Sequence, residues 1–387
     1  MAKIALFTPY LPAPAFTGGR IRISELARGL SEVGEVHLFA QAGKKERAEA
    51  ASAAELQTFA SVYVTQRLQP IWPWLKLPTR VLRGSPRGWK RAVEREGPFD
   101  LLVAEHSHAA GLAFDLKAPL LLDEHNIESR YVAAKWQATG KRQRPHELKK
   151  LEAWERTLWR RAEKIVAVTE ADRAHIAEFA THAPVLIPNG VDLAKIRFIP
   201  PSERRSQKIL FVGLMDHPPN IEAARFLAEQ VMPRVWREKP EARLTLCGAN
   251  PAREVLKLQS ERVEVTGRVH SVAPYLEQAR VCAMPLSQGA GSSLKILEAL
   301  ASGLPLVATE VAVRGFSLTA GQDYRLATDA ETTALHLRSL LTADGDDLQA
   351  RRGRSFAEEF AWPGMAQRFA GLASELLPSV LQQRKPR

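Results

Sequence analysis

Short apolar runs alternate with stretches of helical periodicity along the first half of the chain. This alternation is typical of a parallel sheet with helices on both of its faces. We predict strands at 4–8, 36–40, 101–104, 119–122, 165–169 and 185–187, and a helix at 24–34. Ligands of such sheets bind beyond the carboxyl ends of the strands. The loops that follow these strands are therefore where we expect the chemistry.

The second half of the chain restarts the alternation after a turn at Pro188-Asn189-Gly190-Val191-Asp192 and a linker that runs to residue 202. Strands are predicted there at 208–213, 243–247, 263–266, 281–285 and 305–309, and helices at 220–230 and 272–278. We expect an α/β protein with two Rossmann-like αβα domains that face each other across a cleft. The first spans 1–195 and is completed by a C-terminal helix at 362–387, and the second spans 196–361.

The glycine-rich stretch 289–303 carries the sharpest local signal. It predicts a loop and then a helix that Ser292 or Ser293 caps and Gly303 ends. Lys295 in the first turn opposes the helix dipole, a cost that a bound anion such as phosphate would reverse. Glu298, one turn later, could accept hydrogen bonds from sugar hydroxyls. A glycine-rich turn with a solvated lysine and glutamate fits these residues equally well.

Three loops of the first half also follow predicted strands: Phe16-Thr17-Gly18-Gly19-Arg20, Glu105-His106-Ser107-His108 and 123–130, which includes His125. A Gly-Gly pair before a helix allows the backbone to approach a ligand, although a tight turn explains it as well. Acids and histidines past strand ends suit acid–base work, while capping or salt bridging is the alternative for each. Two histidine-bearing loops at equivalent strand ends favour function.

Composition narrows the class of protein. The 387 residues include 45% hydrophobic and 25% charged residues, as in a globular protein, and no apolar run is long enough to span a membrane. The start of the chain lacks the pattern of a signal peptide, and Cys247 and Cys282 lie in apolar segments as expected for buried thiols. We expect a cytoplasmic protein. The net charge of +11 suits nucleic acid, an anionic membrane or an anionic substrate.

Tryptophans and basic residues mix between residues 67 and 91, with Trp72 and Trp74 at the centre. This mixture suits an anionic membrane surface or a lipid-linked acceptor, and it would also suit stacking on nucleic-acid bases or a partly buried loop. We favour the membrane or lipid-linked acceptor, and we expect no nucleic acid because no nucleic-acid module accompanies these residues. Residues 141–161 hold a second basic cluster and predict a long exposed helix.

The order of these motifs resembles the GT-B glycosyltransferases, specifically the family-4 group of retaining enzymes that use nucleotide sugars. The resemblance is carried by Phe16–Arg20, Pro188–Asp192, Leu210-Phe211-Val212-Gly213, the stretch 289–303, Gly315-Phe316 and Phe360-Ala361-Trp362. It covers nearly the whole chain. The segments 123–126 and 213–220 are similar to the subset that acts in exopolysaccharide and other cell-surface polysaccharide synthesis.

The resemblance implies that the C-terminal domain holds the nucleotide sugar and the N-terminal domain holds the acceptor. Glu298 would hold the ribose hydroxyls, and the amides of Ser293 and Leu294 would meet the distal phosphate, as would the Gly18-Gly19 loop. The donor-binding residues that we predict are Gly18, Gly19, Gly213, Arg268, Gly291, Ser292, Ser293, Leu294, Lys295 and Glu298. The catalytic candidates are Glu105, His106, Lys295 and Glu298, and the acceptor candidates are His125, Trp72 and Trp74.

The chain departs from the family's pattern in several places. The family commonly has a glutamate at the position of Ala290, and many relatives place an arginine and a lysine shortly after the glycine that matches Gly213. The family's usual histidine aligns with Glu105, one residue before His106, so both stay candidates. Without an acidic pair that would bind Mg²⁺ together with a nucleotide sugar, we expect no metal, and no cofactor beyond the nucleotide-sugar substrate.

Three hypotheses follow. The leading one is a cytoplasmic retaining glycosyltransferase that extends a lipid-linked or polysaccharide acceptor, peripheral on the inner membrane face. In the front-face mechanism of such enzymes the leaving phosphate helps to accept the acceptor's proton, so no protein nucleophile is needed. The second, which Ala290 favours, is a catalytically weakened GT-B scaffold that binds a nucleotide or glycan. The third is a GT-B sugar-nucleotide epimerase. It ranks below the transferase because the loop 9–20 and the final helix look more like the transferase pattern.

Overall fold

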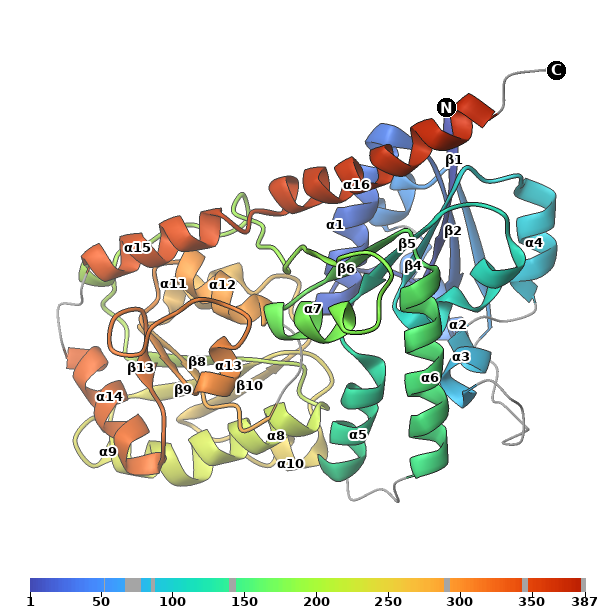
Figure 1. The fold of residues 1–387 in the computed structure, drawn as a ribbon. Coiled ribbons are helices and arrows are strands. Elements are labelled where there is room, and N and C mark those ends of the chain that lie inside the picture. Colours follow the sequence, from blue (N-terminus) through green and yellow to red (C-terminus); the bar gives the residue numbers. More distant parts are fainter. Residues whose placement is uncertain are drawn as a thin grey trace. The chain divides into compact units, whose positions relative to one another are not determined.

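The computed structural model describes residues 1–51, 53–66, 78–84, 88–138, 144–288, 293–342 and 347–383. The chain divides into two compact units (Figure 1). The first contains Met1–Asn189 and Trp362–Arg387, and the second contains Gly190–Ala361. The division thus falls between residues 189 and 190, within the predicted turn, and the last helix belongs to the first unit. Each unit is described by itself below.

The first unit contains a sheet of seven parallel strands in the order β3-β2-β1-β4-β5-β6-β7. The strands are β1 Ala2–Phe7, β2 Gly34–Gln41, β3 Ser61–Thr65, β4 Leu101–Glu105, β5 Leu120–Glu124, β6 Lys164–Ala167 and β7 Val185–Leu186. Most side chains of β1, β4 and β5 are fully buried, as expected for strands covered on both faces. β3 is an edge strand with partly exposed residues, so its apolar signal is weak, and the sequence did not predict it.

The helices of the first unit cover both faces of its sheet. On one face, α4 (Gly88–Glu96), α6 (Pro145–Arg161) and α7 (Glu170–Ala177) pack side chains such as Trp89, Leu158 and Ile176 onto the strands. The other face carries α1 (Gly18–Val33), with α16 (Trp362–Gln383) beside it (Figure 1). The remaining helical segments of this unit are α2 Lys44–Ala50, η1 Ala54–Thr58, α3 Thr79–Gly84, η2 Ser107–Asp115 and α5 Glu128–Ala138.

Helix α16 packs closely against α1. A side chain at Gly29 of α1 would meet the backbone oxygen of Ala366 at 2.5 Å, so the absence of a side chain there permits the close approach. The prediction that residues 141–161 form an exposed helix is wrong for its inner face. Helix α6 buries Leu151, Trp154 and Trp159 against the unit's core, and its basic residues lie mainly on the other face.

The second unit contains a sheet of six parallel strands in the order β10-β9-β8-β11-β12-β13. The strands are β8 Lys208–Val212, β9 Arg243–Cys247, β10 Val263–Gly267, β11 Val281–Met284, β12 Leu306–Ala308 and β13 Arg325–Leu326. Its helical segments are η3 Pro201–Glu203, α8 Pro218–Arg225, η4 Phe226–Val231, α9 Met232–Trp236, α10 Arg253–Leu256, α11 Ala273–Gln278, α12 Leu294–Ala301, α13 Glu310–Val313, α14 Ala330–Thr342 and α15 Asp347–Glu358. The predicted α/β class with two parallel-sheet domains is confirmed.

Two further expectations are settled by the fold. Cys247 and Cys282 are buried free thiols, and burial raises their pKa values to about 11 and about 12. Among the helices that the structure describes, none has both the length and the apolar character required to cross a membrane.

Candidate functional site

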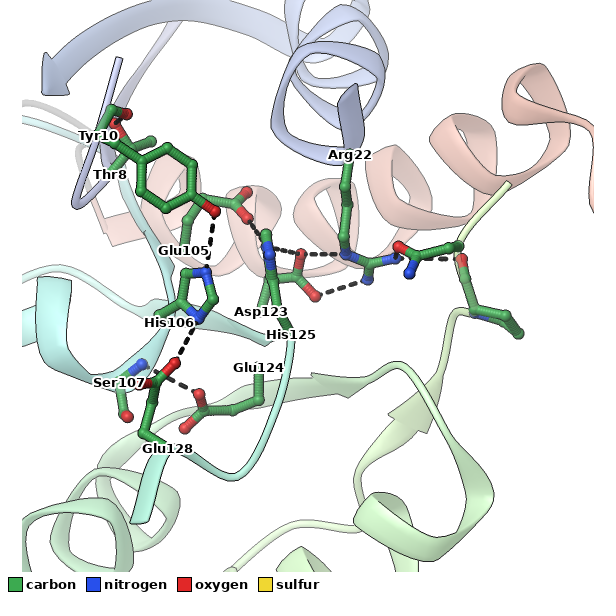
Figure 2. Close-up of polar contacts among 12 residues, drawn as sticks. Thr8, Tyr10, Arg22, Glu105, His106, Ser107, Asp123, Glu124, His125 and Glu128 are labelled. Atoms are coloured by element: carbon green, nitrogen blue, oxygen red, sulfur yellow. Dashed lines mark hydrogen bonds and ion pairs between the residues drawn. The ribbon is translucent and has the colours of Figure 1, made fainter. Parts of the chain in front are cut away.

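Strands β4 and β5 end side by side and deliver a cluster of acids and histidines to one edge of the first sheet. Glu105, the last residue of β4, pairs in register with Asp123 of β5, and His106 and His125 follow just beyond the strand ends. These four side chains are at most 7% exposed. The two histidine-bearing loops, which the sequence placed at equivalent strand ends, therefore lie side by side (Figure 2).

The first part of the cluster is a chain of contacts that begins at a buried arginine. Arg22 of α1 donates two hydrogen bonds to Asp123, of 2.7 and 2.8 Å, and a third to the backbone oxygen of Pro188 at 3.1 Å. His125 Nε2 lies 2.6 Å from Glu105 Oε2 and 3.3 Å from Asp123 Oδ2. Arg22 thereby supplies the positive charge that buried Asp123 needs.

These contacts shift the pKa values of the two carboxyl groups in opposite directions. Burial alone would raise the pKa of Asp123, but Arg22 and His125 hold it well below its usual range. Burial and the negative charge of Asp123 raise the pKa of Glu105 well above its usual range. Asp123 is therefore ionised at neutral pH, whereas Glu105 holds its proton more tightly than an exposed glutamate does.

The second part of the cluster is centred on His106. Its Nε2 lies 3.2 Å from the hydroxyl of Tyr10, and its Nδ1 lies 2.9 Å from Glu128 Oε1. The other oxygen of Glu128 lies 2.5 Å from Arg80 Nε, and His108 Nδ1 is 3.7 Å from it. His106 also stacks obliquely on His125, with ring centroids 4.0 Å apart.

Protonation in this second part follows from the same physics. Burial would raise the pKa of Glu128, but contacts with His108, Arg80 and His106 hold it well below its usual range. Burial lowers the pKa of His106, and the neighbouring His125 lowers it further. Burial also lowers the pKa values of His125 and His108. Neutral imidazoles therefore stand beside an ionised Glu128.

The backbone of His106 is held in an uncommon conformation. Its φ is 70°, in a region that residues other than glycine seldom adopt. Its N–H donates to the backbone oxygen of Asp123 at 2.8 Å, which ties the loop after β4 to the end of β5. Strained residues held by their surroundings concentrate at functional sites. This conformation is an independent reason to regard His106 as functional.

The glycine pair of the first loop lies directly beside this cluster. Gly18 is the first residue of α1, and a side chain at Gly19 would meet the Tyr10 hydroxyl at 2.2 Å. His125 Nδ1 would be 3.6 Å from the same added atom. Gly19 therefore lets the tyrosine reach His106, a reason for glycine that does not require a ligand.

A layer of hydrogen bonds beneath the histidines holds their loops. Glu124 accepts from the backbone N–H of Ser107 at 3.0 Å and from the indole of Trp159 at 2.9 Å. The indole of Trp154 donates to the backbone oxygen of Ser107 at 2.9 Å. Burial and nearby Glu155 raise the pKa of Glu124 well above its usual range. The two tryptophans of α6 thus fix the turn in which His106 lies.

Two triads in the described part of the chain could hold a metal ion: His106 with His108 and Glu128, and Glu105 with Asp123 and His125. In each triad an arginine already meets a carboxylate, Arg80 at Glu128 and Arg22 at Asp123. These guanidinium groups supply the positive charge that a cation would bring. The donor atoms suit a metal, but the neighbouring charges disfavour one, and its absence from the reaction stays a prediction.

In the second unit, the predicted motif helix is α12, which follows β11. Ser293 is its N-cap residue, as predicted, but its side chain makes no capping hydrogen bond. The Ser293 Oγ is buried, and among the described residues it has no hydrogen-bond partner. The first amides of a helix also have no partner within the helix, so this end of α12 offers several donors to an anion.

Lys295 and Glu298 lie one turn apart on α12, and both are partly exposed. Removal from water lowers the pKa of Lys295, and the charge of Glu298 offsets part of this. Removal from water raises the pKa of Glu298 to about 7 although Lys295 acts against the shift. An anionic ligand beside Lys295 would stabilise its charged form.

The C-terminal end of α12 is held by arginines. Arg204 donates to the backbone oxygen of Ser302 and also to that of Leu276 at 2.7 Å, and Arg354 donates to the backbone oxygen of Ala301 at 2.9 Å. Gly303 then ends the helix, as predicted, with φ of 77°. Cations at this end complement the helix dipole, so the negative end of α12 is compensated within the protein.

Other predicted donor residues follow strands of the same sheet. Gly213 follows β8, and Gly248 after β9 packs so closely that a side chain on Gly248 would overlap the backbone oxygen of Gly213. Arg268 is exposed directly after β10. Because parallel strands end at one edge of a sheet, these residues lie at the same edge as the start of α12. Gly291, Ser292, Ala290, Trp72 and Trp74 lie outside the described residues.

Sequence reasoning missed several members of the first cluster. Tyr10 was hidden in a proline-rich loop, and Arg22 and Arg80 carry no motif. Glu128 lies in the loop 123–130, but nothing in the sequence distinguishes it from its neighbours there. The available sequence signal for Arg22 was an arginine at helical spacing after Gly19. Its partner Asp123 is 101 residues away along the chain.

Comparison with known proteins agrees with the resemblance. The model described as Glycosyltransferase Family 4 matches residues 16–195, and the model described as Glycosyl transferases group 1 matches residues 206–343. A Klebsiella pneumoniae protein, described as an uncharacterized 44.6 kDa protein in cps region, is 24% identical over 361 residues, which cover 87% of this chain and 90% of that protein.

Solved structures share the fold. Sucrose-phosphate synthase from Thermosynechococcus elongatus is similar with a TM-score of 0.74 at 19% identity, covering 98% of this chain and 100% of that chain. HepE of Anabaena, solved in complex with UDP and glucose, has a TM-score of 0.69 at 17% identity, covering 97% and 100%. Two family models that together match most of the chain, and two parallel-sheet domains of the same fold, show that this protein belongs to the GT-B glycosyltransferases, with a family 4 domain followed by a group 1 domain.

Proposed function

We propose that this protein is a retaining, metal-independent glycosyltransferase that moves a sugar from a nucleotide-sugar donor to a lipid-linked or polysaccharide acceptor. The observation that carries the proposal is the start of α12, where Lys295 and the Ser293 Oγ, which has no partner in the described part of the chain, flank helix amides within the group 1 domain. This end of the helix would bind the donor diphosphate, and Glu298 would accept from the ribose hydroxyls. HepE, solved with UDP and with UDP-glucose, supports a nucleotide-sugar donor.

The state of the carboxyl groups in the first unit supports a mechanism without a protein nucleophile. A covalent nucleophile must be an ionised group that can reach the sugar. Asp123 and Glu128 are ionised but buried and paired with Arg22 and Arg80, and Glu105 is buried with a raised pKa. The leaving phosphate would then accept the acceptor's proton, and Lys295 would stabilise the charge that develops on the diphosphate.

The proposed acceptor rests on a relative and on the basic, tryptophan-containing segment of the sequence. The Klebsiella relative is described as lying in a cps region, which supports a role in cell-surface glycan synthesis. Trp72 and Trp74 among basic residues would place the enzyme on the inner membrane face, where a lipid-linked acceptor is found. Sedimentation with phosphatidylglycerol vesicles tests this placement. Binding that ignores anionic lipid and the double change Trp72→Ala/Trp74→Ala would contradict it.

Turnover with a panel of nucleotide sugars tests the activity, with membrane extract as the acceptor and released nucleoside diphosphate as the signal. We expect release with one donor, loss of release in Lys295→Ala and Glu298→Ala, and a product that keeps the donor's anomeric configuration by NMR. An inverted product would contradict retention. Tight nucleotide binding without turnover would instead favour the second candidate, a weakened scaffold, which the alanine at position 290 favours.

A further inference from the structure

His106 is held between two partners that distinguish its ring nitrogens. Glu128 Oε1 faces Nδ1 at 2.9 Å, and the Tyr10 hydroxyl faces Nε2 at 3.2 Å (Figure 2). An ionised carboxylate has no proton to donate, so it selects the tautomer of His106 with the proton on Nδ1. Nε2 then carries a lone pair and accepts a hydrogen bond from the Tyr10 hydroxyl.

Neighbouring groups hold both partners in place. Arg80 lies 2.5 Å from the second oxygen of Glu128, which fixes the carboxylate. The hydroxyl of Thr8 donates to the backbone oxygen of Tyr10 at 2.8 Å, which fixes the loop after β1. At Gly19 the missing side chain leaves room for the tyrosine hydroxyl. Three separate segments of the first unit therefore converge on one row of polar contacts.

The row has a direction. The negative charge of Glu128 favours the proton on Nδ1 of His106, and Nε2 accepts from the hydroxyl of Tyr10, so the Tyr10 oxygen is left with lone pairs and no proton for a further partner. His106 is 6% exposed, whereas Tyr10 is a partly exposed residue. A hydroxyl of a sugar is a partner of the required kind, because it can donate to the phenol oxygen.

We propose that Tyr10 contacts a substrate hydroxyl and that Glu128 is a positioning residue, which acts through His106 to make the tyrosine oxygen a hydrogen-bond acceptor. This inference rests on the proposed transferase function and deepens it. His106 then serves as the neutral link between the two, in contact with His125 on its ring face and with His108 beyond.

Nuclear magnetic resonance of the free protein tests the row without any substrate. In protein labelled with ¹⁵N at histidine, the signals of His106 are assigned by their loss in His106→Gln. We expect the pattern of a neutral ring protonated at Nδ1, and a change of that pattern in Glu128→Gln. The matched control is Glu155→Gln, because Glu155 is a buried glutamate of the same unit whose Oε1 accepts from the Ser129 N–H and whose Oε2 has no hydrogen-bond partner among the described residues. A wild-type ring protonated at Nε2, or a doubly protonated ring at pH 7, would overturn the proposal.

Kinetics test the consequence for transfer. Tyr10→Phe and Glu128→Gln should each lower kcat/KM by about tenfold, and the double variant should lose little more, because the two residues act through one row. Glu155→Gln should stay within about twofold of wild type. Equal rates in wild type and Tyr10→Phe, or losses that multiply in the double variant, would overturn it. If no donor is turned over at all, the transferase proposal fails while the resonance experiment still decides the tautomer.

Discussion

At the scale of single residues, the first unit sorts its buried carboxyl groups by whether an arginine reaches them. Asp123 meets Arg22 and Glu128 meets Arg80, and both have lowered pKa values. Glu105 and Glu124 form no ion pair with an arginine in the described part of the chain, and their pKa values are raised. A buried charge without a counter-charge is costly, so an unpaired carboxyl keeps its proton instead. The position of two guanidinium groups therefore sets the charge pattern of the whole cluster.

Replacing Arg22 with methionine should remove the charge that keeps Asp123 ionised. We expect a loss of about 3–5 kcal/mol of unfolding free energy, because the partner is left buried and unpaired. Arg28→Met on the same helix is the control: its pair with Glu25 is at the surface, with Arg28 62% exposed, and the expected loss is below about 1 kcal/mol. Urea unfolding followed by tryptophan fluorescence measures both. Equal losses in the two variants would contradict the special role of Arg22.

Glu155 provides a pH-dependent test. Burial raises its pKa to about 7, whereas an unfolded glutamate titrates near about 4.3. Between these values the folded state keeps a proton that the unfolded state has lost, so the contribution of Glu155 to stability falls as pH rises and is lost above pH 7. Glu155→Gln should therefore change the unfolding midpoint little at pH 5 and raise it at pH 8, where the relief is about 3 kcal/mol. A midpoint raised equally at both pH values would contradict this assignment.

At the scale of elements, α12 is oriented by charges at both ends, whereas α1 and α16 are joined by close packing. Arg204 and Arg354 bind the last carbonyls of α12, and Lys295 stands at its start, where its charge opposes the helix dipole and Glu298 offsets only part of the cost. Helices α1 and α16 come from opposite ends of the chain and meet at Gly29. The first arrangement prepares a binding site, and the second completes a domain.

The same substitution at two helical glycines should have opposite effects. Alanine is favoured over glycine in a helix by about 1 kcal/mol. At Gly371 of α16 an added side chain meets no atom within 4 Å, so Gly371→Ala should stabilise the first unit slightly. At Gly29 the added carbon would lie 2.5 Å from the Ala366 oxygen, which is backbone, so Gly29→Ala should destabilise the unit. Thermal unfolding compares the two, and a gain at both positions would show that the helices separate freely.

The sequence predicted what is encoded locally and missed what is encoded by long-range contact. Buried strands such as β4 and β5 are recognisable as apolar runs, and the histidines that follow them could be named as candidates. Gly303 and Ser293 were found because helix ends have short signatures. Tyr10 and Arg80 could not be assigned, because their partners His106 and Glu128 are distant in the chain and neither residue type marks a site. Strand β3 was missed because an edge strand needs little apolar character.

At the scale of the whole molecule, the chain carries two chemical environments, one in each unit. The first unit holds neutral histidines and paired carboxylates at the ends of β4 and β5. The second holds a helix start after β11 with a lysine and with donors that have no partner among the residues described. Anions suit the second environment and polar hydroxyls suit the first. This contrast supports the proposed division, with the nucleotide in the second unit and the acceptor in the first.

The division predicts which variants lose nucleotide binding. Calorimetric titration with UDP should show at least about tenfold weaker binding in Lys295→Met, about 1.4 kcal/mol, because the cation beside the diphosphate is gone. His106→Asn should bind UDP within about twofold of wild type yet lose turnover. Lys257→Met, an exposed lysine of the same unit, controls for the loss of one positive charge and should change neither property. If His106→Asn abolished UDP binding while Lys295→Met kept it, the nucleotide would belong to the first unit, and the assignment of the two domains would have to be reversed.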